Sequence, residues 1–145
     1  MPCVFRSPHE DIQQTVIPMP DEQPALAGCR VLIVEDEWFL AADLQVALKS
    51  LGANVVALVG DLDEALDLLA HDGFDIAVLD INLRGRLAFG IADQLQQRGI
   101  PFVFATGYPS DAIPTQFADV TLWEKPFDPR QVVGDIARLW HRGSE

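Results

Sequence analysis

The chain has 145 residues and a formal net charge of −12, with 22 acidic side chains against ten lysines and arginines. This length is enough for one domain with a sizeable core, and the scattered basic residues exclude unaided binding to nucleic acid, which needs a basic patch. We expect no membrane segment or signal peptide, since no apolar run approaches ~18 residues, and two cysteines without a disulfide framework favour a cytoplasmic protein.

The chain divides into three segments of different composition. Residues 1–27 contain five prolines with little hydrophobic periodicity, which predicts an extended or disordered arm. Residues 28–142 have the pattern of a globular domain, and residues 143–145 form a short tail. We find no internal repeat and no second domain.

The globular part alternates between short apolar runs, typical of buried strands, and helical repeats that end at glycines. In chain order we predict a strand at 30–34, a helix that ends at Gly52, a strand at 54–59, a helix that Asp61 caps and that ends before Gly73, a strand at 76–79, a helix at 87–98, a strand at 102–105, a strand at 120–123 and a last helix that Asp128 caps. Pro109 and Pro114 leave room only for a short or irregular helix near residues 110–117. This alternation predicts an α/β fold with right-handed connections and a parallel sheet covered by helices on both faces.

Chemically active side chains follow several of the predicted strands. Glu35 and Asp36 come after the first strand, Asp80 after the third, Thr106 after the fourth and Lys125 after the fifth. Because ligands of open α/β sheets bind outside the carboxyl ends of the strands, we expect these side chains to meet at one edge. A cluster of carboxylates supplies the hard oxygen ligands that suit Mg²⁺.

Four short stretches at these strand ends resemble the response regulator receiver domain, the phosphoacceptor module of two-component systems. They are "VEDE" at 34–37, "LDINLRG" at 79–85, "FATG" at 104–107 and "EKPF" at 124–127. They occur in the order that the family has, and the resemblance covers about residues 28–142. It implies a flavodoxin-like, doubly wound sheet of five parallel strands in the order 2-1-3-4-5.

The resemblance also implies a role for each matching residue in phosphoryl transfer. Asp80 matches the aspartate that accepts a phosphoryl group from the phosphohistidine of a kinase. Thr106 matches the hydroxyl that contacts the phosphoryl group, and Lys125 matches the lysine that pairs with it. Pro126 implies a cis peptide bond after Lys125.

The implied cofactor is Mg²⁺. Asp36 and Asp80 match its carboxylate ligands, while Glu35 matches the acid that usually holds the metal through water. Asn82 matches the residue whose backbone carbonyl completes the protein ligands. Phosphorylation then adds charge at this edge and biases the domain between two arrangements.

Two features depart from the usual receiver pattern. Leu122, followed by Trp123, stands where the family commonly has a tyrosine or phenylalanine that switches with the threonine. "FATGY" together with this missing aromatic resembles the FAT GUY class, which is paired with HWE or HisKA2 kinases, although that class has a small residue between glycine and tyrosine. We therefore expect Tyr108 to take over part of the switching role.

The resemblance implies a signalling protein that is not a conventional enzyme. The last predicted helix leaves no room for an output domain, which favours a stand-alone receiver. Its partners would be a histidine kinase or a histidine phosphotransfer protein, and a downstream protein that contacts the fifth strand and last helix. Trp123 and Trp140 are candidate anchors there. All three tryptophans, including Trp38, are interpreted as core or core-edge residues.

Two other functions fit parts of the same pattern. A receiver-like scaffold that binds partners without phosphorylation would keep these acids only as remnants. A Mg²⁺-dependent phosphatase of the haloacid dehalogenase type also uses a strand-end aspartate, but it needs D-x-D on its first strand, whereas Asp80 begins D-x-N on the third. Taken singly, Asp36 is also compatible with a helix cap and Asp80 with a turn residue. Thr106 is compatible with an ordinary hydroxyl at a strand end, and Lys125 with a solvated surface lysine.

Overall fold

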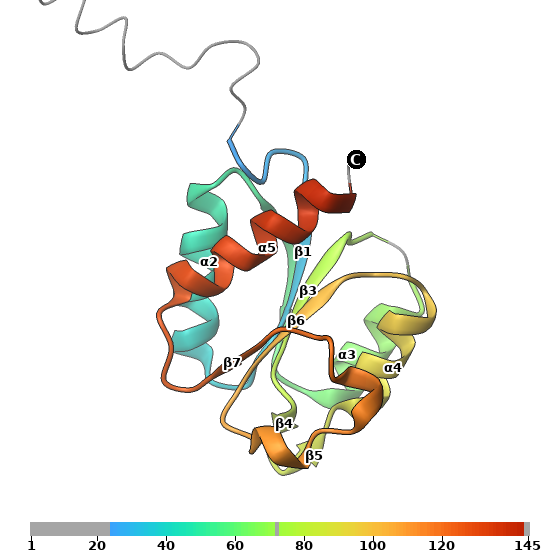
Figure 1. The fold of residues 1–145 in the computed structure, drawn as a ribbon. Coiled ribbons are helices and arrows are strands. Elements are labelled where there is room, and N and C mark those ends of the chain that lie inside the picture. Colours follow the sequence, from blue (N-terminus) through green and yellow to red (C-terminus); the bar gives the residue numbers. More distant parts are fainter. Residues whose placement is uncertain (1–23, 72, 144–145) are drawn as a thin grey trace, which may run out of the picture.

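The computed structural model describes residues 24–71 and 73–143 (Figure 1). The sheet contains β1 (Arg30–Val34), β2 (Asn54–Val59), β3 (Ile76–Leu79), β6 (Phe102–Thr106) and β7 (Leu122–Glu124). All neighbouring strands are parallel, and their order is β2-β1-β3-β6-β7. This arrangement confirms the predicted five-stranded, flavodoxin-like α/β fold.

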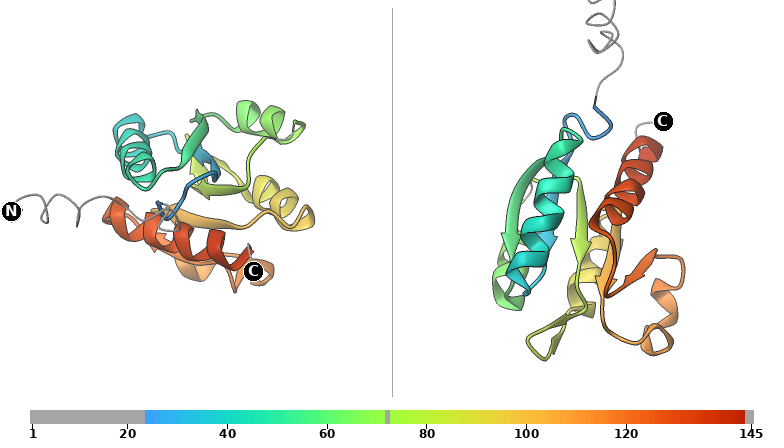
Figure 2. Two further views of the ribbon diagram at one scale, coloured as in Figure 1. Left: turned by 90° about the horizontal axis from the view of Figure 1, so that it is seen from above. Right: turned by 90° about the vertical axis from the view of Figure 1, so that its left-hand side faces the viewer.

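Two helices cover each face of the sheet. Helices α2 (Trp38–Ser50) and α5 (Pro129–Gly143) lie together on one face, and α3 (Leu62–Leu69) and α4 (Phe89–Gln97) lie on the other (Figure 1; Figure 2). The central strands β1, β3 and β6 are almost wholly buried between these layers. Their continuous apolar sequences reflect this burial on both faces.

The ends of several elements follow the predicted local signals. The side chain of Asp61 accepts a hydrogen bond from the backbone N–H of Glu64 at 3.1 Å, which confirms it as the N-cap of α3. Between β6 and β7 the chain forms only two 3-10 turns, Ser110–Ala112 and Thr115–Phe117. Each turn begins after a proline, as expected for a segment that cannot form a long helix.

An unpredicted hairpin follows β3. Strands β4 (Asn82–Leu83) and β5 (Arg86–Leu87) pair in antiparallel fashion, at the lower edge of the molecule in Figure 1. Arg84 and Gly85 form the turn with φ angles of 55° and 86°. The predicted helix at 87–98 was therefore placed too early, because Leu87 belongs to the hairpin and α4 begins at Phe89.

The burial of two apolar side chains differs from the prediction. Leu26, which falls in the predicted arm, is fully buried in the core, and its backbone N–H donates to the carbonyl of Leu51. Residues 1–23 of that predicted arm lie outside the described residues. Trp38 is 76% exposed at the start of α2, so its interpretation as a core residue is wrong.

Candidate functional site

The carboxyl ends of β1, β3, β6 and β7 converge on a depression of about 380 Å³. Parallel strands bring their ends to one edge, so residues far apart in sequence meet there. The residues that line the depression are Asp36, Glu37, Asp80, Asn82, Gly107, Tyr108, Pro109 and Lys125. Glu35 and Thr106 lie beside it in the interior. The predicted site residues are therefore brought together.

Asp80 is the buried centre of this group, with both carboxylate oxygens hydrogen-bonded. Its Oδ1 accepts from the Thr106 hydroxyl at 2.6 Å and from the backbone N–H of Asn82 at 3.2 Å. Its Oδ2 accepts from the Lys125 ammonium at 2.9 Å. Thr106 is itself fully buried and accepts from the backbone N–H of Tyr108 at 3.1 Å. These contacts hold one carboxylate between a hydroxyl group and a cation.

Lys125 binds three carboxylates at once. Its Nζ lies 2.9 Å from Glu35 Oε2 and 2.9 Å from Asp80 Oδ2, and it also pairs with Glu37. Burial alone lowers the pKa of this ammonium, but its hydrogen bonds with the three carboxylates raise the pKa above its ordinary value. Lys125 is therefore charged at any physiological pH. The cis peptide bond between Lys125 and Pro126 agrees with the expected backbone at this position.

The charged form of Glu35 is disfavoured at its buried position in this cluster. Its Oε2 accepts from Lys125 and from the backbone N–H of Glu37, but its buried Oε1 has no hydrogen-bond partner among the described residues. Burial raises the pKa of Glu35 to about 8, although the N–H of Glu37 opposes this shift. A buried carboxylate oxygen without a partner is costly and marks a place where a cation or water fits.

Three carboxylates have the arrangement of a divalent cation site. Glu35, Asp36 and Asp80 each offer one oxygen, and these oxygens all lie within 4.8 Å of one another. Oxygen-only ligands suit Mg²⁺, and the unpartnered Oε1 of Glu35 adds to the case. Asp36 is held in place by the backbone N–H of Arg84, which donates to its Oδ2 at 3.0 Å. The residues present therefore fit the metal that the sequence implied.

The raised pKa of Glu35 predicts that the stability of the folded protein falls as the pH rises. Between pH 4.5 and about 8 the folded protein retains a proton that the unfolded chain has lost, so raising the pH favours unfolding. We expect the free energy of unfolding to fall by at least about 1 kcal/mol across this window in protein free of divalent cations, since one unit of pKa difference corresponds to about 1.4 kcal/mol. Denaturant titrations at a series of pH values measure this slope.

The matched control for this slope is Glu35→Gln, which has no titrating proton at the same position. Its stability is expected to change little between pH 5.5 and pH 8. A wild-type stability that stays level or rises across that interval would contradict the assignment of the slope to Glu35.

Glu37, for which the sequence predicted no role, and Tyr108, for which it predicted part of the switch, both line the depression. Glu37 was visible only as the last of three consecutive acids, yet it pairs with Lys125 across 88 positions of the chain. Tyr108 lines the depression, and its ring meets Phe89 edge-on with centroids 5.7 Å apart. Phe89 stacks in turn on Phe117 of the second 3-10 turn, 5.8 Å away. An aromatic row thus connects the site to the segment between β6 and β7.

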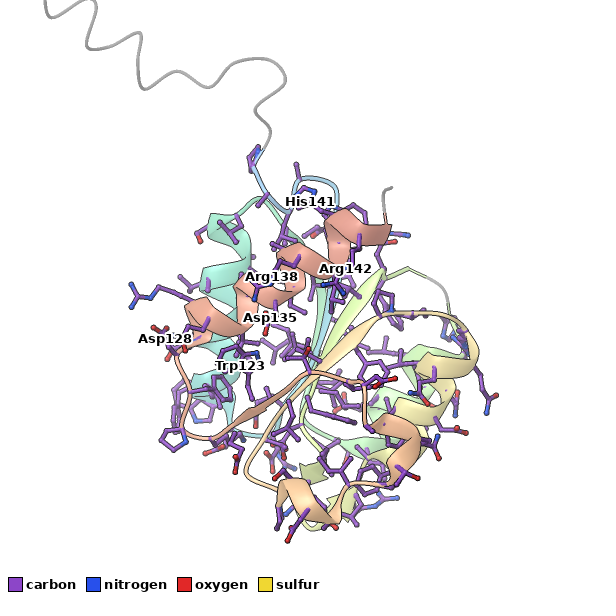
Figure 3. All side chains as sticks on the ribbon, in the orientation of Figure 1. Trp123, Asp128, Asp135, Arg138, His141 and Arg142 are labelled. Atoms are coloured by element: carbon purple, nitrogen blue, oxygen red, sulfur yellow. The ribbon has the colours of Figure 1, made fainter. Side chains whose placement is uncertain are left out.

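The face formed by β7 and α5 also carries an ordered polar contact. The indole N–H of Trp123 donates to Asp135 at 2.5 Å, and Arg138 pairs with the same carboxylate (Figure 3). Trp123 is partly buried against the core, in agreement with its interpretation as a core-edge residue.

None of the helices in residues 24–71 and 73–143 is long and apolar enough to cross a membrane.

Comparisons with known proteins agree with this geometry. Residues 31–137 match the family model of the response regulator receiver domain. The solution structure of SdrG from Sphingomonas melonis is 38% identical, covering 80% of this chain and 98% of that one, with a TM-score of 0.68. The response regulator PhyR from Brucella abortus is 27% identical, covering 83% of this chain and 52% of that one, with a TM-score of 0.67.

A curated relative extends the comparison to a longer protein. The sensory transduction protein LytR from Staphylococcus haemolyticus is 26% identical over 78% of this chain and 46% of its own length. The chain spans about half the length or less of the curated relatives it matches. The family match covers most of the residues that form the sheet and its helices. The chain therefore belongs to the response regulator receiver domain family of two-component signalling proteins.

Proposed function

We propose that this receiver is a phosphoacceptor in which Asp80 takes a phosphoryl group from the phosphohistidine of a partner. The observation that carries this proposal is the position of the Asp80 carboxylate, which is buried between the Thr106 hydroxyl and the Lys125 ammonium and lies beside two further carboxylates. The carboxylates of Glu35 and Asp36 repel this buried acid, so clustering the three acids does not by itself favour folding. It is well placed as a nucleophile.

The chemical step exchanges one phosphorus bond for another. A carboxylate oxygen of Asp80 forms an O–P bond while the N–P bond of the phosphohistidine breaks, and the electron pair of that bond returns to the imidazole nitrogen. Lys125 is positioned to offset charge on the phosphoryl oxygens, and the Thr106 hydroxyl can move from Asp80 to one of those oxygens. Water later attacks the acyl phosphate and releases phosphate, so the mark is transient.

Glu35, Asp36 and Asp80 are the side chains that would hold Mg²⁺, with the backbone carbonyl of Asn82 as the remaining proposed protein ligand. When bound, the metal neutralises charge that otherwise makes the carboxylate and the phosphoryl group repel one another. Asn82 already contacts Asp80 through its backbone N–H, and its side chain accepts from Gly85 in the hairpin turn. These contacts support a position for Asn82 at the edge of the metal site.

We infer a signalling output through protein contacts. A histidine kinase of the HWE or HisKA2 type, or a histidine phosphotransfer protein, would supply the phosphoryl group. Strand β7 and helix α5 would contact the downstream partner. The likeness to PhyR, which is described as a response regulator, supports a signalling role in general. Partly exposed Trp123, tied to Asp135, would serve as an anchor on that face.

Tyr108 is proposed to carry part of the switch, because Leu122 offers no aromatic ring for it. The Tyr108 N–H bonds to Thr106, and its ring contacts the row formed by Phe89 and Phe117. We expect Tyr108→Ala to reduce by at least about half the NMR shift changes that beryllofluoride causes in residues 110–117. Tyr108→Phe keeps the ring and is expected to retain them. Undiminished changes in the alanine variant would exclude this role.

The test of the proposed function is binding of beryllofluoride, which mimics a phosphoryl group on a carboxylate. With Mg²⁺ present, the wild-type protein is expected to bind it stoichiometrically, and fluorine NMR detects the bound form. A protein that acts only as a scaffold would give no bound signal. Steady turnover of phosphate esters would instead indicate a phosphatase.

A further inference from the structure

Glu37 occupies a helix cap without using its side chain to cap the helix. It precedes α2, yet its carboxylate accepts no hydrogen bond from the first turn of that helix. Serine, threonine, aspartate or asparagine would be favoured at such a position because their short side chains reach the free N–H groups. The Glu37 side chain instead extends to Lys125. Local helix formation therefore does not explain it.

The Glu37–Lys125 pair separates two surface features. On one side lies the acidic depression that contains Asp80, and on the other lies a groove of about 330 Å³ lined by Phe39, Leu40, Pro126 and Phe127. Glu37 and Lys125 contribute to the walls of both. A phosphoryl group entering the depression would therefore arrive next to this ion pair.

Lys125 has no spare donor for a phosphoryl oxygen. An ammonium group has three N–H donors, and Lys125 bonds to three carboxylates. An added phosphoryl oxygen must therefore displace one of these partners. The side chains of Glu35 and Asp80 are 1% and 3% exposed, whereas that of Glu37 is 46% exposed. Water can replace Lys125 at Glu37 but not at the buried acids, so Glu37 is the partner that is released at least cost.

We propose that Glu37 is a positioning residue that competes with the phosphoryl group for Lys125. In the resting protein it holds the ammonium at the mouth of the site, and on phosphorylation Lys125 exchanges Glu37 for a phosphoryl oxygen. This inference rests on the proposed function. Glu37 thereby lowers the affinity of the site for a phosphoryl group and sets how readily the receiver becomes active.

Glu37→Gln tests the competition, since glutamine keeps the size of the side chain but removes its charge. We expect this variant to bind beryllofluoride about 2- to 5-fold more tightly than wild type in the presence of Mg²⁺, the range that an exposed ion pair contributes. Phosphorylation by acetyl phosphate is expected to accelerate by a similar factor. Fluorine NMR titrations and intact-mass spectrometry measure the two effects.

Two further variants separate the ion pair from simple charge and from folding. Glu124→Gln removes the same charge from the exposed residue next to Lys125, which is not among the three acids that bond to Lys125 in the described part of the chain. This variant is expected to change the affinity by less than Glu37→Gln. Glu37→Asp keeps the charge but shortens the reach, and should resemble Glu37→Gln. A purely structural role would change thermal unfolding without increasing the affinity for beryllofluoride.

Each possible result of these titrations either supports or overturns the competition between Glu37 and the phosphoryl group. Unchanged or weaker binding by Glu37→Gln overturns the competition, as does an equal gain in Glu124→Gln. If the wild-type protein and all variants fail to bind beryllofluoride, the proposed function itself is wrong and the inference falls with it. Tighter binding in both Glu37 variants, with Glu124→Gln close to wild type, supports the competition.

Discussion

Asp80→Asn is expected to reduce phosphoryl acceptance to background. Asparagine has nearly the same shape as aspartate and can keep hydrogen bonds with its neighbours, but its amide is not a nucleophile toward phosphorus. The wild-type protein, incubated with acetyl phosphate and Mg²⁺, should gain the mass of one phosphoryl group. The variant should gain none, and beryllofluoride should give no bound fluorine signal.

The control for this result is a carboxylate outside the site. Asp111 is exposed in the first 3-10 turn, and Asp111→Asn should accept the phosphoryl group at the wild-type rate. Asp80→Asn is also expected to remain folded, because it removes one of several mutually repelling acids around Lys125. A folded Asp80→Asn protein that still gains an acid-labile phosphoryl group would refute the assignment of the nucleophile.

The positions of the main site residues could be predicted because topology determines them. Once β1, β3, β6 and β7 are read as parallel strands, the residues that follow them must meet at one edge. Asp80, Thr106 and Lys125 illustrate this, since each directly follows or ends a strand that the apolar pattern identified. Their convergence depends on the order of the strands and not on details of side-chain packing.

The features that escaped prediction depend on details that no periodicity carries. The hairpin β4–β5 is formed by two-residue strands, which are too short to produce an alternating pattern. Its turn places Arg84 at a positive φ, which is uncommon for residues other than glycine and could not be expected from an arginine at this position. The contact between Glu37 and Lys125 depends on the reach of two long side chains. Trp38 is exposed because Ala41, Leu44 and Leu48 occupy the buried face of α2.

Charge in the site is unbalanced without a further cation. Lys125 supplies one positive charge against the carboxylates of Glu35, Glu37 and Asp80, which it contacts, and of Asp36 nearby. Folding therefore maintains a local excess of negative charge, which Lys125 reduces and the proposed metal would reduce further. Burial raises the pKa of Glu35 and the charge of Asp80 raises it further, so a proton retained on Glu35 is another way to remove one negative charge.

Lys125→Met is consequently expected to cause the largest loss of stability among the variants considered. It leaves Glu35 and Asp80 buried without their cation, and removing one partner of a buried ion pair costs roughly 3–5 kcal/mol. The loss should be smaller at pH 6 than at pH 8, since Glu35 can take up a proton at the lower pH. Added Mg²⁺ should restore part of the stability, because the same acids would bind it.

Denaturant unfolding at both pH values, with and without Mg²⁺, measures these effects, and Lys49→Met is the matched control. Lys49 lies exposed in the last turn of α2, so its loss should change stability by no more than about 0.5 kcal/mol. Lys125→Met should also accept phosphoryl groups far more slowly than wild type, because its methionine cannot offset charge on the incoming oxygens. If the variant were as stable as wild type at pH 8 without divalent cations, the charge of Lys125 could not be what offsets the cost of burying Glu35 and Asp80.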